Sequence, residues 1–280
     1  MLFGLVGSEM CIRDSRISQE FEQHLLTEKV HRIEKKDLFQ HIKKTIEKQF
    51  DTYTSELYEL ASRLDQLKRP VIIYIGGAPG TGKSMLATSL ATRLGINKVI
   101  STDSIREIMR LAFSNDLLPT LFHSTTEAWK GLPMEFQSSE QLIAGYCLQA
   151  NQVSLGVRAV VERTVEEGEN LIVEGAHLVP FLHEIAKKEM VDAYHIPITL
   201  SIMNEKHHRE RFSERGTKNL RKIENFYLER FDGIRSIHEY TLTQCETDEV
   251  EVFDNEDLDE TLNLIIQFSI QRLFKQVNSE

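Results

Sequence analysis

An eight-residue run, Gly77-Ala78-Pro79-Gly80-Thr81-Gly82-Lys83-Ser84, constrains the fold of this chain more than any other segment. It fits the pattern G-x-x-x-x-G-K-[ST], in which glycines let the backbone curl until successive N–H groups face one anion. A continuous apolar run at residues 71–75, bounded by proline and glycine, is typical of a buried parallel strand. Apolar residues at helical spacing follow the run, so the positive end of a helix adds to the anion site. Strand, loop and helix together predict a phosphate-binding loop.

The chemistry of this loop predicts a nucleotide cofactor, and we expect ATP with Mg²⁺. The Lys83 ammonium can reach the β- and γ-phosphates, and the Ser84 hydroxyl can ligate the metal. All eight residues, 77–84, are therefore expected to bind the cofactor. Switches, motors and kinases share such a loop, so other residues must decide among them.

The remaining pattern predicts the rest of the sheet. Further short apolar runs lie at residues 99–100, 171–173, 198–202 and 250–253. Helical stretches at 85–94, 156–167 and 223–240 alternate with them. Strands that alternate with helices form a parallel sheet covered on both faces. We expect an α/β, P-loop NTPase three-layer fold with a mostly parallel sheet, preceded by an N-terminal helical segment.

Three segments are expected along the chain. Residues 1–15 look like a translated sequencing adaptor, with a disordered terminus as the alternative, and we expect no contribution to the fold from them. Residues 16–69 carry two apolar stripes at helical spacing and predict the helical segment. Residues 70–280 then form the P-loop domain.

Composition disfavours several kinds of partner. A net charge of -10 and a pI near 5.6 argue against binding nucleic acid or an anionic membrane surface. No apolar run approaches the roughly 20 residues that a membrane helix needs. The three cysteines lack metal or CxxC spacing, which indicates a reducing, cytoplasmic compartment. A small anionic substrate remains compatible with these features, and no feature of the sequence bears on oligomeric state.

Two carboxylates follow predicted strands, at the sheet edge where ligands of such folds bind. Asp103 could accept the proton of an acceptor hydroxyl, or it could belong to a helix N-terminus, where Ser104 and Glu107 have capping-box spacing. Glu174 could hold the Mg²⁺ water shell or polarise a nucleophile, with a solvated strand end as the alternative. The residue types do not divide these roles between the two carboxylates.

Basic residues form two clusters. Arg106 and Arg110 lie four apart and could clamp a carboxylate or phosphate of the acceptor, unless they form a solvated face. The second cluster follows the fourth strand and comprises His208, Arg209, Arg211 and Arg215. Arginines there could form a lid that stabilises transition-state charge, although interleaved glutamates also fit a surface charge run. His123, Trp129 and His177 are further candidates for the acceptor pocket, with ordinary packing as their alternative.

Together these residues resemble the 2-phosphoglycerate kinase family. The matching segments are residues 75–77, 102–107, 123–125, 128–129, 174–180 and 208–212. The resemblance implies transfer of the ATP γ-phosphate to 2-phosphoglycerate, giving 2,3-bisphosphoglycerate. It also implies that Asp103 contacts the acceptor and that the basic residues hold its phosphate and carboxylate. Some members of the family carry an ATP-cone-like N-terminal domain, of which residues 16–69 could be a remnant.

Other functions remain open at this point. A toxin-like kinase for a nucleotide-sugar shares the loop and an acidic residue near the second strand. A non-enzymatic ATP-dependent switch is a different class, and the arginines near Asp103 and after the fourth strand argue against it. An AAA-type remodelling machine is disfavoured because no separate helical domain follows the nucleotide core.

Overall fold

The computed structural model describes residues 64, 67–133, 138–182, 184, 192–216 and 227–279. The adaptor-like residues 1–15 and nearly all of the helical segment expected over 16–69 lie outside the described residues. Two compact units divide the chain, Arg69–Thr261 and a second formed by Met1–Lys68 with Leu262–Glu280. The first unit holds the sheet and the phosphate-binding loop. The second includes most of helix α11 (Leu258–Val277).

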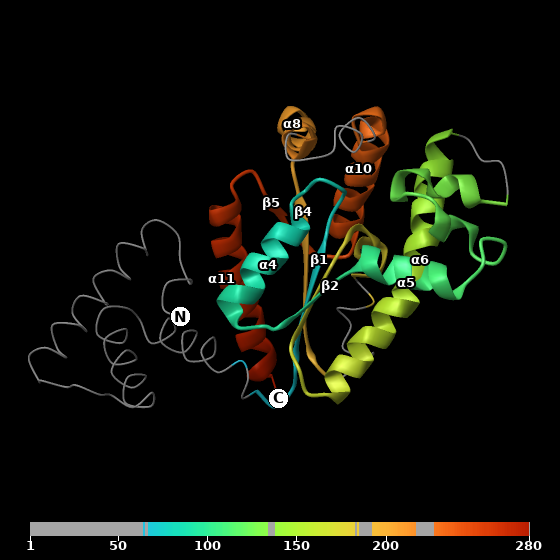
Figure 1. Ribbon diagram of the computed structural model, residues 1–280. Helices are drawn as coiled ribbons and strands as arrows, with labels where there is room; N and C mark the ends of the chain where they lie inside the picture. Colours follow the sequence, from blue (N-terminus) through green and yellow to red (C-terminus); the bar gives the residue numbers. More distant parts are fainter. Residues whose placement is uncertain are drawn as a thin grey trace, which may run out of the picture. The chain divides into compact units, whose positions relative to one another are not determined.

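A five-stranded parallel sheet forms the centre of the first unit (Figure 1). Its strands are β1 (Val71–Gly76), β2 (Lys98–Ser101), β3 (Leu171–Glu174), β4 (Tyr194–Ser201) and β5 (Glu251–Asp254). The order β2-β3-β1-β4-β5 places β1, the strand before the loop, in the middle. The α/β class and the parallel sheet expected from the sequence are thus confirmed.

Strand β4 is longer than its apolar run predicts, because His195 and Pro197 interrupt the pattern. Both residues belong to the strand, whose eight positions are all buried. The His195 ring is accommodated in the core by the Tyr74 hydroxyl, which lies 3.1 Å from its Nδ1 atom. The apolar pattern therefore predicted only the second half of β4.

Helices and short 3₁₀ turns connect the strands. They are α4 (Lys83–Leu94), α5 (Thr102–Ala112), η2 (Pro119–Phe122), η3 (Thr125–Gly131), α6 (Ser138–Glu166), η4 (Ala176–Phe181), α8 (Glu205–Gly216) and α10 (Phe231–Thr247). Helix α6 has 29 residues, and the apolar spacing had predicted only its C-terminal part. Helix α10 continues seven residues beyond the predicted end at Tyr240.

The two faces of the sheet bury different helices. Ile72 and Tyr74 of β1 belong to one apolar cluster with α5 and α6, and Val157 of α6 lies in the same cluster. Helix α4 contacts β1, β2 and β3 and buries Leu86 and Leu90. Because side chains alternate along a strand, each strand contributes side chains to both faces of the sheet.

Because all the strands are parallel, their carboxyl ends lie at one edge of the sheet. The loops that follow the strands therefore also lie at that edge.

Candidate active site

The phosphate-binding loop is shaped by glycines in left-handed backbone. Gly77, Gly80 and Gly82 have φ angles of 135°, 87° and 90°. A Cβ atom at Gly77 would lie 2.3 Å from the Leu200 carbonyl oxygen, and one at Gly80 would lie 2.3 Å from the Phe212 ring. Glycine is required at these positions both for its φ range and for the space. The loop is thereby held between β4 and α8.

Lys83 and Ser84 occupy the start of α4. The Lys83 ammonium is buried and donates a hydrogen bond of 2.8 Å to the Ala78 carbonyl, inside the loop. The Ser84 hydroxyl donates to Glu174 Oε1 at 2.9 Å. Strands β1 and β3 pair directly, with Ile75 opposite Glu174, and this register brings the carboxylate to the loop. The structure therefore joins three of the residues that the sequence had singled out.

The Ser84–Glu174 pair fits a magnesium ion. Mg²⁺ is bound by oxygen ligands, commonly one or two carboxylates together with substrate phosphates and water. A hydroxyl and a carboxylate beside a phosphate-binding loop supply that donor set. Within the described part of the chain, no group of three or more His, Cys, Asp or Glu side chains could hold a metal by itself. The residues thus suit a metal that arrives with a nucleotide.

Helix α5 begins earlier than the capping-box spacing predicts. Its cap is Ser101, whose hydroxyl accepts a hydrogen bond from the Ser104 backbone N–H at 3.1 Å. Ser104 and Glu107 therefore do not form the expected capping box. Asp103 lies in the first turn with its side chain 65% exposed, and one carboxylate oxygen is 3.8 Å from the Arg106 guanidinium. The carboxylate is consequently accessible to an acceptor.

Arg106 and Arg110 both contact Glu107. The Arg110 Nη1 atom donates to both Glu107 oxygens at 2.9 Å, and the Arg106 Nη2 atom donates to Oε1 at 3.2 Å. Arg106 also donates to the His123 carbonyl at 3.0 Å, and the Arg110 guanidinium lies 5.2 Å from the centre of the Phe122 ring. An anion held by both arginines would therefore have to displace Glu107. Of the two arginines, Arg106 also lies 3.8 Å from a carboxylate oxygen of Asp103.

The three weaker candidates lie in different places. His177 is 1% exposed, so a ligand has no access to its ring. His123 offers its backbone carbonyl to Arg106. Trp129 is 37% exposed on η3, with the Lys130 ammonium 5.9 Å from its ring centre. Trp129 therefore contacts a neighbouring lysine on η3, whereas the Asp103–Arg106 pair lies on α5.

Helix α8 is anchored on the loop by its first turns. His208 is fully buried, and its Nε2 atom lies 2.9 Å from the Pro79 carbonyl oxygen, to which it must donate. Burial lowers the pKa of His208 to about 4, so the ring is neutral near pH 7. Arg211 donates to the backbone carbonyls of Asn255 and Glu256. His208 thus packs against the loop and helps to hold it, which argues against the lid role expected from the sequence.

The other members of the second basic cluster differ from Arg211. The Arg209 guanidinium lies 4.1 Å from the centre of the Phe231 ring and 4.0 Å from carboxylate oxygens of Glu205 and Asp232. It contacts α10 instead of the loop. The side chain of Arg215 lies outside the described residues. Of the arginines in this cluster, Arg211 therefore lies near the nucleotide loop, whereas Arg209 contacts α10.

Two residues near the loop had escaped the sequence reasoning. Asn255, 1% exposed after β5, donates from Nδ2 to the Thr81 carbonyl at 2.8 Å. Tyr146, fully buried on α6, packs against Ala78 and donates from its hydroxyl to the Ala176 carbonyl at 2.6 Å. Applying the rule of strand carboxyl ends to the fifth strand would have pointed to Asn255. Tyr146 lies in the N-terminal part of α6, which the apolar spacing did not predict.

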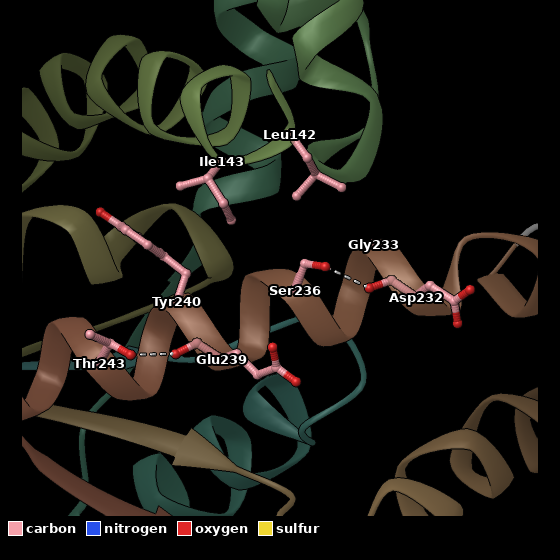
Figure 2. Close-up of a pocket in the computed structure, with 8 residues that line it drawn as sticks. All are labelled: Leu142, Ile143, Asp232, Gly233, Ser236, Glu239, Tyr240 and Thr243. Atoms are coloured by element: carbon pink, nitrogen blue, oxygen red, sulfur yellow. Dashed lines mark hydrogen bonds between the residues drawn. The ribbon is translucent and has the colours of Figure 1, made fainter. Parts of the chain in front are cut away.

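A groove of about 570 Å³ lies between α6 and α10, as Figure 2 shows. Leu142 and Ile143 face Tyr240 across it, and Asp232 and Glu239 add two carboxylates along α10. None of its lining residues is among the expected site residues. Its acidic lining also suits an anionic acceptor poorly.

Comparisons with known proteins place these features in a family. A family model described as an AAA domain, a family of P-loop kinases, matches residues 73–232. A curated 2-phosphoglycerate kinase of Methanopyrus kandleri is 35% identical over 262 residues, covering 92% of this chain and 78% of the relative. The enzyme of that name from Methanocaldococcus jannaschii is 35% identical, and the match covers 95% of this chain and 84% of the relative. The one from Pyrococcus furiosus is 39% identical, and the match covers 80% of this chain and 72% of the relative. The chain belongs to the 2-phosphoglycerate kinase family.

Membership of the 2-phosphoglycerate kinase family confirms that the chain is an ATP-dependent kinase. Among solved structures, a gluconokinase from Sinorhizobium meliloti 1021 aligns with 13% identity and a TM-score of 0.45, covering 76% of this chain and 98% of its own. A shikimate kinase from Acinetobacter baumannii aligns with 12% identity and a TM-score of 0.42, covering 77% and 98%. Within the described residues, every helix is too short or too polar to cross a bilayer.

Proposed function

We propose that this chain transfers the γ-phosphate of ATP to the free hydroxyl of 2-phosphoglycerate, giving ADP and 2,3-bisphosphoglycerate. The observation that carries the proposal is the arrangement at the carboxyl ends of β1, β2 and β3. The loop with Lys83 follows β1, Asp103 and Arg106 follow β2, and Glu174 ends β3. The names of the curated relatives support the choice of acceptor.

The nucleotide half of the site follows from the loop. The Lys83 ammonium now donates to the Ala78 carbonyl at 2.8 Å. When ATP binds, its phosphate oxygens would replace this carbonyl as the acceptor. Ser84 and Glu174 would hold Mg²⁺, and the bound metal offsets charge on the phosphate oxygens. Arg211 lies beside the loop, because a Cβ atom at Gly82 would be only 3.3 Å from its Nη1 atom. Its guanidinium group would stabilise negative charge on the transferred phosphoryl group.

The acceptor half rests on Asp103 and Arg106. We infer that the exposed Asp103 carboxylate accepts the proton of the acceptor hydroxyl as its oxygen bonds to the γ-phosphorus. The bond from phosphorus to the β–γ bridging oxygen breaks, and ADP leaves. Arg106, with Arg110 beside it, would bind the carboxylate or phosphate of the acceptor in place of Glu107. His123 supports Arg106 through its carbonyl group.

The decisive test measures ADP release with Mg-ATP and four conditions: 2-phosphoglycerate, 3-phosphoglycerate, a nucleotide-sugar, and no acceptor. We expect turnover that depends on 2-phosphoglycerate. Lys83→Ala should abolish it, whereas the surface variant Lys98→Ala, which removes an ammonium paired with Glu167 and Glu169, should not. Turnover with another acceptor would replace the proposed substrate, and ATP binding without acceptor-dependent turnover would favour the switch.

A further inference from the structure

A buried polar network begins at the turn after β3. Gly175 has a φ of 153°, and a Cβ atom there would lie 1.8 Å from the Thr102 hydroxyl oxygen. The glycine therefore lets the start of α5 approach this turn. Two residues on, the His177 Nδ1 atom lies 2.8 Å from the same Thr102 hydroxyl. The ends of β2 and β3 are thus joined by a side-chain hydrogen bond.

Gln149 of α6 fixes the direction of every hydrogen bond in this network. Its Nε2 atom donates to the Thr120 carbonyl at 2.6 Å and to the His123 carbonyl at 3.0 Å. Its Oε1 atom is therefore an acceptor, and the His177 Nε2 atom, 3.1 Å away, must carry a proton. In a neutral ring Nδ1 is then an acceptor, so the Thr102 hydroxyl donates to it. Burial lowers the pKa of His177 to about 4, which keeps the ring neutral.

The two ends of the network meet the proposed acceptor residues. Thr102 is the first residue of α5 and directly precedes Asp103. The His123 carbonyl, held by Gln149, also accepts a hydrogen bond from Arg106 at 3.0 Å. One continuous set of contacts therefore reaches both members of the Asp103–Arg106 pair, whose charged atoms are 3.8 Å apart.

We propose that Thr102, Gln149 and His177 are positioning residues, which fix Asp103 and Arg106 in the geometry that the acceptor requires. They are 0%, 0% and 1% exposed, so they act through their neighbours and cannot contact the substrate. Satisfied buried hydrogen-bond networks hold a single geometry, because breaking one member leaves its partners unpaired. This inference rests on the acceptor site proposed above.

Thr102 offers the sharpest test, because two substitutions separate its hydroxyl from its shape. Thr102→Val keeps the volume and removes the donor to His177, whereas Thr102→Ser keeps the donor. We expect Thr102→Val to lower kcat/KM for 2-phosphoglycerate by about tenfold or more, while the KM for ATP changes by less than about twofold. Thr102→Ser should stay within about threefold of the unsubstituted protein.

Thr164→Val is the matched control. Thr164 is also buried, and its hydroxyl donates to the Val160 carbonyl within α6 at 2.8 Å. This variant loses a buried hydroxyl without touching the network, so its thermal stability should fall while its kinetics stay unchanged. The comparison separates a general loss of stability from a loss of positioning.

The outcomes distinguish the inference from the function beneath it. An active unsubstituted protein in which Thr102→Val and Thr164→Val have equal kinetics would overturn the positioning role and leave the proposed function intact. A Thr102→Val variant that loses affinity for ATP and acceptor alike would also overturn it. An unsubstituted protein without turnover on 2-phosphoglycerate would overturn the proposed function, and the inference with it.

Discussion

Gly80→Ala should destabilise the protein mainly through contact with an aromatic ring. The φ angle of Gly80 is 87°, and an alanine in this region costs about 1–2 kcal/mol. The new Cβ atom would also lie 2.3 Å from Phe212 Cζ and 3.0 Å from His208 Nε2. The Phe212 ring has little room to move, because it stacks on Tyr227 at 5.1 Å between centres and meets the edge of Phe231 at 6.2 Å.

Overpacking of this kind costs about 1–3 kcal/mol, so we expect Gly80→Ala to lower the free energy of unfolding by about 2–5 kcal/mol in total. Gly95→Ala provides the control for the backbone alone. Gly95 has a φ of 70°, and a Cβ atom there would meet no atom within 4 Å. It should therefore cost only about 1–2 kcal/mol.

Urea unfolding of four proteins measures the contact directly: the unsubstituted chain, Gly80→Ala, Phe212→Leu and the double variant. If the ring is the obstacle, the double variant is more stable than the sum of the two single effects predicts, by about 1–3 kcal/mol. Additivity to within about 0.5 kcal/mol would refute the reasoning, as would equal costs for Gly80→Ala and Gly95→Ala.

Three further predictions concern the site. Lys83→Met should lower kcat by about a hundredfold or more without changing the urea midpoint, and a shifted midpoint with normal kcat would contradict the role of its ammonium. Glu174→Gln keeps an acceptor for the Ser84 hydroxyl but loses the charge, so the Mg²⁺ concentration for half-maximal turnover should rise about tenfold; an unchanged Mg²⁺ dependence would reject Glu174 as a ligand. Burial lowers the pKa of His208 from 6.5 to about 4, so on acidification the unfolded chain takes up the proton first, and stability present above pH 6.5 is lost as the pH falls towards 4. Urea midpoints across this range should fall for the unsubstituted protein and fall less for His208→Gln, and parallel curves would contradict the effect.

The sequence predicted those parts of the site that local pattern determines. The loop at 77–84 and the strand before it are contiguous, so motif and apolar run were sufficient. Glu174 was found because it ends an apolar run, and strand pairing then brought it to Ser84. Parallel strands deliver their ends to one edge, which makes such residues predictable in position even without a known register.

Other residues could not be placed because a neighbouring charge or a distant part of the chain decides their contacts. Helical spacing put Arg106 and Arg110 on one face, but Glu107 between them takes both guanidinium groups. His208 was predicted to belong to a lid because it shares a helical face with Arg211 and Arg215 after the fourth strand, yet its ring packs against the Pro79 carbonyl of the loop. Asn255 reaches the loop across 174 residues of sequence, a contact that no local pattern contains.

The central place of β1 has a consequence for how the chain matures. This strand and its loop are synthesised well before their partners: the Val71–Asn170 hydrogen bond spans 99 residues, and the Tyr74–His195 contact spans 121. Pairing over such separations is slow, because a long loop must close before any contact forms. The hydrogen bond from Asn255 to the Thr81 carbonyl forms later still, because it spans 174 residues. A growing chain therefore cannot complete its nucleotide loop until Asn255 has left the ribosome.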